Sequence, residues 1–301
     1  MAKNPEKASY RHRGRLTPTR PASNLAERWT LVDGVDVFYR ESPAHLDAPV
    51  MTHLHGFGLS GRYLLPTAER LADEFHTYVP DLPGFGRSGK PKESLDVPGL
   101  AHAAARFLDD RGVEKTTLVG NSMGCPVILE FARRYPERVH RTVLVSPAGG
   151  VFNQPLRRAV GQLAKDGGLE PRKMISVATP DYLRFGVPST FKMFKALTEY
   201  PSLKRLLELQ IPTLVVIGER DPLLPGPERV QEVANQTDSH VLVVLLEGAA
   251  HAINFSHPGE LANVIRLFMH DKPIRDDPRF PDHRRVFEVH RGKHHPPPRD
   301  P

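Results

Sequence analysis

The chain has 301 residues, 39% of them hydrophobic and 25% charged, and it contains one cysteine. That length fits one α/β domain with a modest insertion, and a lone Cys125 excludes an internal disulfide. The net charge of +6 belongs to the ends, because residues 1–24 and 271–301 together carry +7 and the body between them about −1. We therefore expect no nucleic-acid partner, since such enzymes carry basic patches on the folded surface.

No stretch has the length and apolar character of a membrane span, and the N-terminus lacks the apolar segment of a secretory signal. The expected location is cytoplasmic. Residues 1–24 are basic and without hydrophobic periodicity, which predicts a disordered arm. The tail over 271–301 is rich in proline and histidine and is expected to be disordered or loosely draped. It lacks a rigid frame, so no metal site is expected at His290, His294 and His295.

Between the two ends, strand and helix patterns alternate. Residues 29–40 predict a hairpin with Asp33-Gly34 as its turn. Later strands are predicted over 50–54, 76–80, 115–120, 141–146, 213–218 and 241–246, and helices over 61–73, 97–112, 123–135, 226–236 and 258–270. This alternation predicts a mostly parallel, doubly wound sheet built from 25–148 and 209–270. The intervening 149–208 show helical patterns only and predict a helical cap after the sixth strand.

One pentapeptide carries the main chemical signal. Gly120-Asn-Ser122-Met-Gly124 follows a predicted buried strand and precedes a predicted helix, which is the context of a nucleophile elbow. The sharp turn lifts the serine hydroxyl clear of the backbone, and side chains at the two glycine positions would clash there. Ser122 is thus the predicted nucleophile.

A serine nucleophile needs a base and an orienting carboxylate. Asp221 lies just past the predicted strand 213–218, and His251 just past 241–246. Because parallel strands end at one edge of a sheet, Ser122, Asp221 and His251 can converge there. The oxyanion of an acyl-transfer intermediate also needs backbone donors. We predict the N–H of Met123 and, from the loop after strand 50–54, the N–H of Phe57.

These motifs resemble the α/β-hydrolase superfamily, serine-nucleophile branch. The matching segments are His55-Gly-Phe-Gly58, Asp81-Leu-Pro-Gly-Phe-Gly-Arg-Ser88, the elbow, Gly218-Glu-Arg-Asp-Pro222 and Gly248-Ala-Ala-His251. The resemblance implies an α/β-hydrolase fold and an acyl-enzyme mechanism on a small-molecule substrate, with no cofactor. A carboxylic ester is the leading substrate. Alternatives are a carbon–carbon bond hydrolase of ring-cleavage products, a perhydrolase or acyltransferase, and a ligand-sensing receptor that retains the triad.

Two positions depart from the carbon–carbon hydrolases. Those relatives usually carry a second glycine after the elbow and often a tryptophan after the catalytic histidine, where this chain has Cys125 and Ala252. The predicted cap supplies aromatic residues that could line an acyl pocket or form the cap's own core, namely Tyr182, Phe185, Phe191 and Phe194. Its ten basic against five acidic residues over 150–208 could favour anionic substrates, although a solvated face explains them as well. A homodimer is left open.

Overall fold

The structure is a computed structural model that describes residues 24–43, 48–147, 151–226, 228, 230, 232, 240–276 and 286–296. The predicted arm 1–24, apart from Asn24, lies outside these residues, as does most of the predicted helix 226–236. Among the described residues, no helix combines the length and apolar character needed to cross a bilayer.

The described residues form one nine-stranded sheet in the order β1-β2-β4-β3-β5-β6-β7-β8-β9. Its strands from β3 to β8 pair in parallel, and β1, β2 and β9 add antiparallel edges. The strands are β1 (Ala26–Val32), β2 (Val35–Glu41), β3 (Val50–Leu54), β4 (His76–Pro80), β5 (Thr116–Asn121), β6 (Val139–Val145), β7 (Thr213–Gly218), β8 (Val241–Leu246) and β9 (Val286–Arg291). The predicted doubly wound α/β sheet is confirmed.

Antiparallel strands form both edges of the sheet. Asp33 and Gly34 turn the β1–β2 hairpin with φ of 47° and 79°, the left-handed region that glycine and aspartate tolerate. At the other edge, β9 pairs with β8 from Leu242↔Arg291 to Leu246↔Val286. The expectation of a disordered tail is therefore wrong for Val286–Arg291. The β8 strand would otherwise leave a row of unpaired backbone groups at the sheet edge, and the tail covers it.

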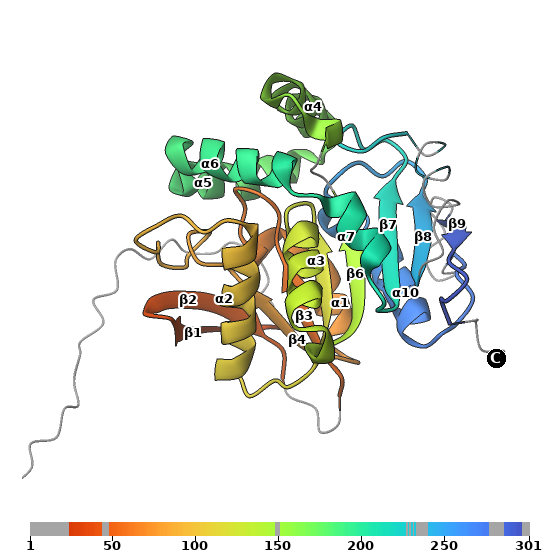
Figure 1. The fold of residues 1–301 in the computed structure, drawn as a ribbon, viewed down its shortest axis with the longest axis horizontal. Coiled ribbons are helices and arrows are strands. Elements are labelled where there is room, and N and C mark those ends of the chain that lie inside the picture. The colour runs from red at the N-terminus through yellow and green to blue at the C-terminus, as the bar shows by residue number, and fades with distance from the viewer. Residues whose placement is uncertain are drawn as a thin grey trace, which may run out of the picture.

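Helices cover both faces of the sheet (Figure 1). On one face, α2 (Val97–Asp110) and α3 (Gly124–Arg134) pack over a core that includes Leu118 and Leu144. On the other, α1 (Leu65–Leu71) and α10 (Pro258–Met269) pack over strand residues such as Val143 and Val216. The short helices η1 (Gly61–Leu64) and α9 (Ile253–Ser256) complete this part of the molecule.

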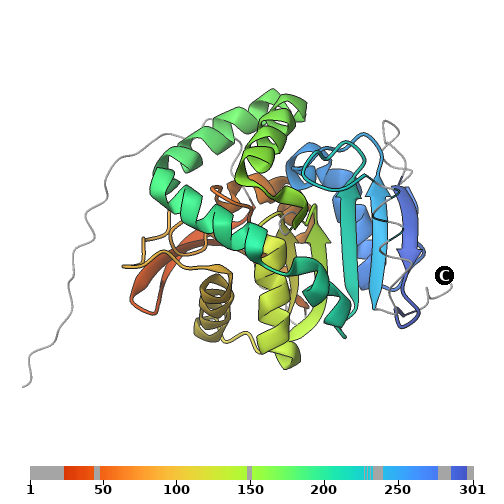
Figure 2. The same cartoon turned by 45° about the horizontal axis from the view of Figure 1, so that its top comes forward.

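Four helices fill the segment between β6 and β7, namely α4 (Leu156–Leu169), α5 (Arg172–Phe185), α6 (Val187–Glu199) and α7 (Ser202–Glu208). Among the described residues of 151–208 there is no strand, as the helical pattern predicts. Helices α4 to α6 lie beyond the carboxyl ends of the strands, above the edge where the predicted site residues emerge (Figures 1 and 2). We call α4 to α7 the cap helices.

Candidate active site

Ser122 occupies a strained turn between β5 and α3. Its φ of 55° lies in the left-handed region, an uncommon conformation for a residue other than glycine. The turn brings backbone segments very close together. A Cβ added to Gly120 would lie 2.7 Å from the Gly124 carbonyl carbon, and one added to Gly124 would lie 2.4 Å from the Leu54 oxygen. The two glycines therefore let α3 begin directly against β5 and the end of β3, with Ser122 raised between them.

Asp221 and His251 meet beyond the ends of β7 and β8. The Nδ1 atom of His251 lies 2.8 Å from Oδ2 of Asp221, and both residues are 7% exposed. The Leu223 N–H donates to the other carboxylate oxygen at 2.9 Å. Among the described residues, the buried His251 Nε2 has no hydrogen-bond partner, so no hydrogen bond joins it to Ser122. The imidazole is thus held on one side and has a free nitrogen on the other.

The buried pair shifts both titrations. Burial alone would raise the pKa of Asp221, but the His251 charge and hydrogen bond outweigh it and lower that pKa. Burial alone would lower the pKa of His251, whereas the charge and hydrogen bond of Asp221, with further carboxylates nearby, raise it to about 9. The arrangement therefore stabilises an imidazolium, which is the form that a general base takes after it accepts a proton.

Hydrogen bonds of the His55 ring hold the loop after β3. The Leu82 N–H donates to His55 Nε2 at 3.0 Å, so a neutral His55 carries its proton on Nδ1 and donates to the Gly56 oxygen at 2.9 Å. Burial lowers the pKa of His55, which favours this neutral form. Phe57, which follows Gly56, and Met123 line the same cavity as Ser122. The two predicted oxyanion donors thus come from residues beside the predicted nucleophile.

A network that the sequence did not reveal links these loops. The Tyr63 hydroxyl accepts from the Gly56 N–H at 2.7 Å and donates to Asn121 Oδ1 at 2.6 Å. The Asn121 amide in turn donates to the His251 oxygen at 3.1 Å and the Val145 oxygen at 3.2 Å. One buried tyrosine and one asparagine therefore connect the loop after β3, the elbow and the histidine loop. Since their partners are up to 130 residues away, no local pattern could have identified them.

The cavity beside Ser122 is small and mostly apolar. Its volume is about 40 Å³, and it is lined by Phe57, Ser122, Met123, Asn153, Ala159, Leu163, Phe194, Leu197, Thr198 and Leu223. Half of this lining comes from α4 and α6. The helices α4 and α6 therefore form much of the wall beside Ser122.

The cap aromatics divide into different roles. The Phe57 ring makes edge-to-face contacts with Phe194 at 5.8 Å and Phe185 at 5.5 Å, and it lies 6.5 Å from Tyr182. Phe194 lines the cavity beside Ser122, whereas Phe185 does not. Phe185 lies one layer back, stacked on Phe85 at 4.5 Å. The structure does not place Phe191 in the pocket: the residue is 56% exposed and does not line the cavity.

The tail histidines have structural neighbours. The His294 ring stacks on His240 at 5.3 Å, and the His295 ring packs against Phe268 at 5.6 Å. His290 lies in β9, paired with Val243. Cys125 is fully buried just after the elbow, and burial raises the pKa of its thiol well above the usual range. It therefore acts as a small packing residue rather than a thiolate.

The fold and this edge of the sheet define a class: α/β proteins with a nucleophile elbow and an acid–histidine pair after later strands. The chain belongs to the alpha/beta hydrolase family, whose profile matches residues 53–264. The matched range includes Ser122, Asp221 and His251.

Curated relatives of different activity are similar to the chain. A pimeloyl-[acyl-carrier protein] methyl ester esterase of Aeromonas salmonicida (strain A449) is 27% identical over 73% of this chain and 95% of its own. A 2-hydroxy-6-oxo-6-phenylhexa-2,4-dienoate hydrolase of Burkholderia cepacia is 29% identical over 65% and 79%. Some other curated relatives match over less than half of their own length. Among solved structures, a membrane phospholipase A shares 26% identity at a TM-score of 0.71, covering 82% of this chain and 86% of its own.

Proposed function

We propose that the protein is a serine hydrolase that cleaves carboxylic esters through an acyl-enzyme. The single observation that carries the proposal is the oriented pair of Asp221 and His251, joined at 2.8 Å, at the sheet edge where the elbow presents Ser122. A strained serine turn has a clear use if its hydroxyl must reach both a base and a substrate carbonyl. No cofactor is required for this chemistry, and a cytoplasmic location stays a prediction.

In the proposed reaction, His251 Nε2 accepts the Ser122 hydroxyl proton as the oxygen attacks the ester carbonyl. The N–H groups of Met123 and Phe57 stabilise the resulting oxyanion. His251 then gives the proton to the leaving alkoxide, and in the second half of the cycle it activates a water that releases the acid. Asp221 holds the tautomer with its proton on Nδ1 and stabilises the imidazolium.

The cavity lining favours an uncharged acyl group of small or medium size. It contains no lysine, arginine or histidine among the described residues. The relative from Burkholderia cepacia acts, by its name, on a dienoate, whose carboxylate would need a cationic or strongly polar partner. The esterase from Aeromonas salmonicida acts on a methyl ester. The apolar lining therefore supports ester cleavage over carbon–carbon cleavage.

A paired substrate assay tests this choice. Turnover of p-nitrophenyl butyrate is compared with turnover of a vinylogous 1,5-diketone at matched concentrations, with Ser122→Ala as the control for background hydrolysis. We expect the ester to be the better substrate and the control to be inactive on both. A diketone preferred by a factor of ten or more would overturn the ester assignment and make the carbon–carbon hydrolases the functional relatives.

A further inference from the structure

Two carboxylates of the cap reach the main chain of the histidine loop. The His251 N–H donates to Asp166 Oδ1 at 3.2 Å, and the Ala252 N–H donates to Glu170 Oε1 at 2.6 Å. Asp166 lies in the last turn of α4, and Glu170 is the C-cap residue that follows the helix. The Glu170 N–H donates to the main-chain oxygen of Asp166 at 3.0 Å. The two acids are four residues apart and so share one helix face. They bind consecutive N–H groups of the loop that carries the predicted base.

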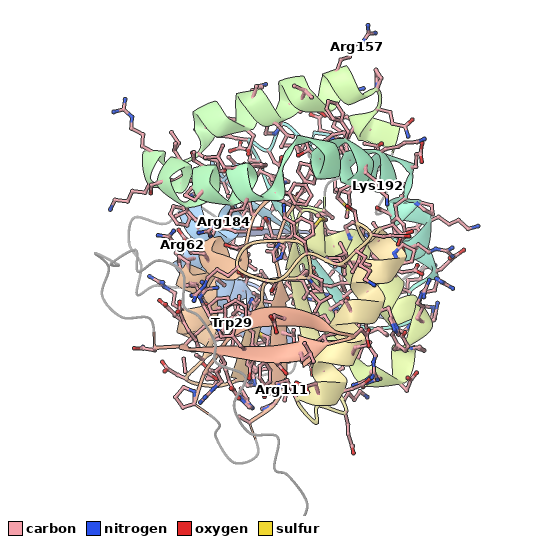
Figure 3. The ribbon with its side chains drawn as sticks, turned by 90° about the vertical axis from the view of Figure 1, so that its left-hand side faces the viewer. Trp29, Arg62, Arg111, Arg157, Arg184 and Lys192 are labelled. Atoms are coloured by element: carbon pink, nitrogen blue, oxygen red, sulfur yellow. The ribbon has the colours of Figure 1, made fainter. Side chains whose placement is uncertain are left out.

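Most of the acidic side chains of the cap accept hydrogen bonds from the rest of the molecule instead of facing solvent. Residues 150–208 contain ten basic and five acidic side chains. Three of the acids turn inward, since Asp181 accepts from the Ser60 N–H at 2.9 Å and the Ser60 hydroxyl at 2.6 Å, and Asp166 and Glu170 accept from the histidine loop. Nearly all the basic residues of this segment are exposed. Arg157, for example, extends from α4 away from the rest of the molecule (Figure 3).

We propose that Asp166 and Glu170 are positioning residues: they fasten α4 to the backbone of His251, and so couple closure of the cap to the orientation and charge of the catalytic base. The proposal rests on the proposed function, because it assigns His251 a proton-transfer role. It goes beyond that function because it assigns part of the orientation and charge state of His251 to residues of the cap. Asp166 is 85 residues from His251 in the sequence, and Glu170 is 82 residues from Ala252.

The electrostatic consequence follows from what surrounds the imidazole. Asp221 faces it from the loop after β7, and Asp166 and Glu170 face it from the end of α4. The neighbouring phenols of Tyr182 and Tyr63 stay neutral, because burial raises the pKa of each. Burial opposes an imidazolium, but the three carboxylates outweigh it and together raise the pKa of His251 to about 9.

Neither cap carboxylate is neutralised by a basic side chain. Among the described residues, Asp166 and Glu170 form no ion pair with lysine or arginine, and the second oxygen of Glu170 is buried without a hydrogen-bond partner. Burial raises the pKa of Asp166, and it raises the pKa of Glu170 to about 7. The charge of Glu170 is therefore added only as the pH rises through about 7.

The test compares Asp166→Asn with Asp181→Asn in the full-length protein. The amide oxygen of the introduced asparagine can still accept from the His251 N–H, so the change removes charge and keeps the contact. Asp181→Asn is the matched control, because it removes a similarly buried carboxylate from the same cap that binds Ser60 instead. The acidic limb of kcat/KM for p-nitrophenyl butyrate should move to lower pH by about half a unit or more in Asp166→Asn only. Its plateau should also fall several-fold, because the imidazolium formed during proton transfer loses a stabilising charge.

A second measurement does not depend on turnover. The pKa of His251 is followed by NMR in protein labelled with ¹⁵N-histidine, with the signal assigned by its loss in His251→Gln. The expected result is a lower pKa in Asp166→Asn and an unchanged one in Asp181→Asn. Should Asp166→Asn fail to fold, Glu170→Gln replaces it. A lower pKa of His251 is again expected, because Glu170, with a pKa of about 7, is ionised where His251 titrates at about 9.

The outcomes separate the two proposals. An NMR pKa that moves in a chain without esterase activity would contradict the proposed function and keep the positioning role. An active enzyme whose acidic limb and His251 pKa are unchanged in Asp166→Asn, or change equally in Asp181→Asn, would overturn the positioning role and leave the function standing.

Discussion

Replacing Gly124 by alanine should damage the elbow without touching any polar group. The added Cβ would lie 2.4 Å from the Leu54 oxygen, 3.0 Å from the Leu54 carbonyl carbon and 3.2 Å from the His55 oxygen. Ordinary contact begins at 3.4 Å, so the nearest atom must retreat by about 1 Å. All three atoms are backbone at the end of β3, and a side-chain rotation cannot relieve the overlap.

Overpacking of this kind costs typically about 1–3 kcal/mol, and we expect a loss of about 3 kcal/mol in the free energy of unfolding because backbone must move. The displaced segment leads into Gly56 and Phe57, so kcat/KM on an ester should fall about 100-fold, the usual cost of a misplacement of about 1 Å. Urea unfolding followed by circular dichroism measures the first effect. Gly161→Ala is the control, since its Cβ would meet nothing within 4 Å on α4. A Gly124→Ala protein within ~0.5 kcal/mol of the parent, the scale of surface changes, would refute this account of the elbow.

Three other changes test the site and its flanks. Asp221→Asn should lower kcat on p-nitrophenyl butyrate by about 10³- to 10⁴-fold with KM little changed, because the wrong imidazole tautomer is favoured. An effect that appears mainly as a raised KM would argue against this role. The raised pKa of His251 should stabilise the fold fully below pH 6.5, with this stability lost as pH rises through about 9, so unfolding measured across that range should show a weaker pH dependence in His251→Gln than in the parent. Removal of residues 1–22 should leave kcat/KM within a few-fold, and a large loss with intact folding would show that this arm reaches the site.

Features encoded by short, contiguous patterns could be predicted from the sequence. The strand ends before Asp221 and His251 and the glycines around Ser122 are local signals, and the parallel order of the strands then brings the loops to one edge. The alternation of strand and helix patterns likewise indicated a mostly parallel, doubly wound sheet. Local pattern therefore sufficed for the sheet and for the residues that we propose as the triad.

Features that depend on distant partners could not be predicted. Asp166 and Glu170 look like ordinary acids of a polar helix, and only folding shows that they bind the backbone of His251 and Ala252. The strand β9 was missed because proline and charge on both sides of it resemble a disordered tail, while its pairing with β8 is a long-range event. Phe191 and Phe194 are three residues apart and neighbours on α6, so the pattern does not separate them, and only the packing shows that Phe194 is buried and Phe191 exposed.

The central claim is that Ser122 is a nucleophile activated by His251 and Asp221, and covalent labelling tests it most directly. The purified protein is treated with a fluorophosphonate, its intact mass is measured and the modified peptide is sequenced. We predict one adduct per chain, located on Ser122, with none in Ser122→Ala and much slower labelling in His251→Gln. An adduct that persists in Ser122→Ala, or a folded protein that does not react at all, would contradict the account.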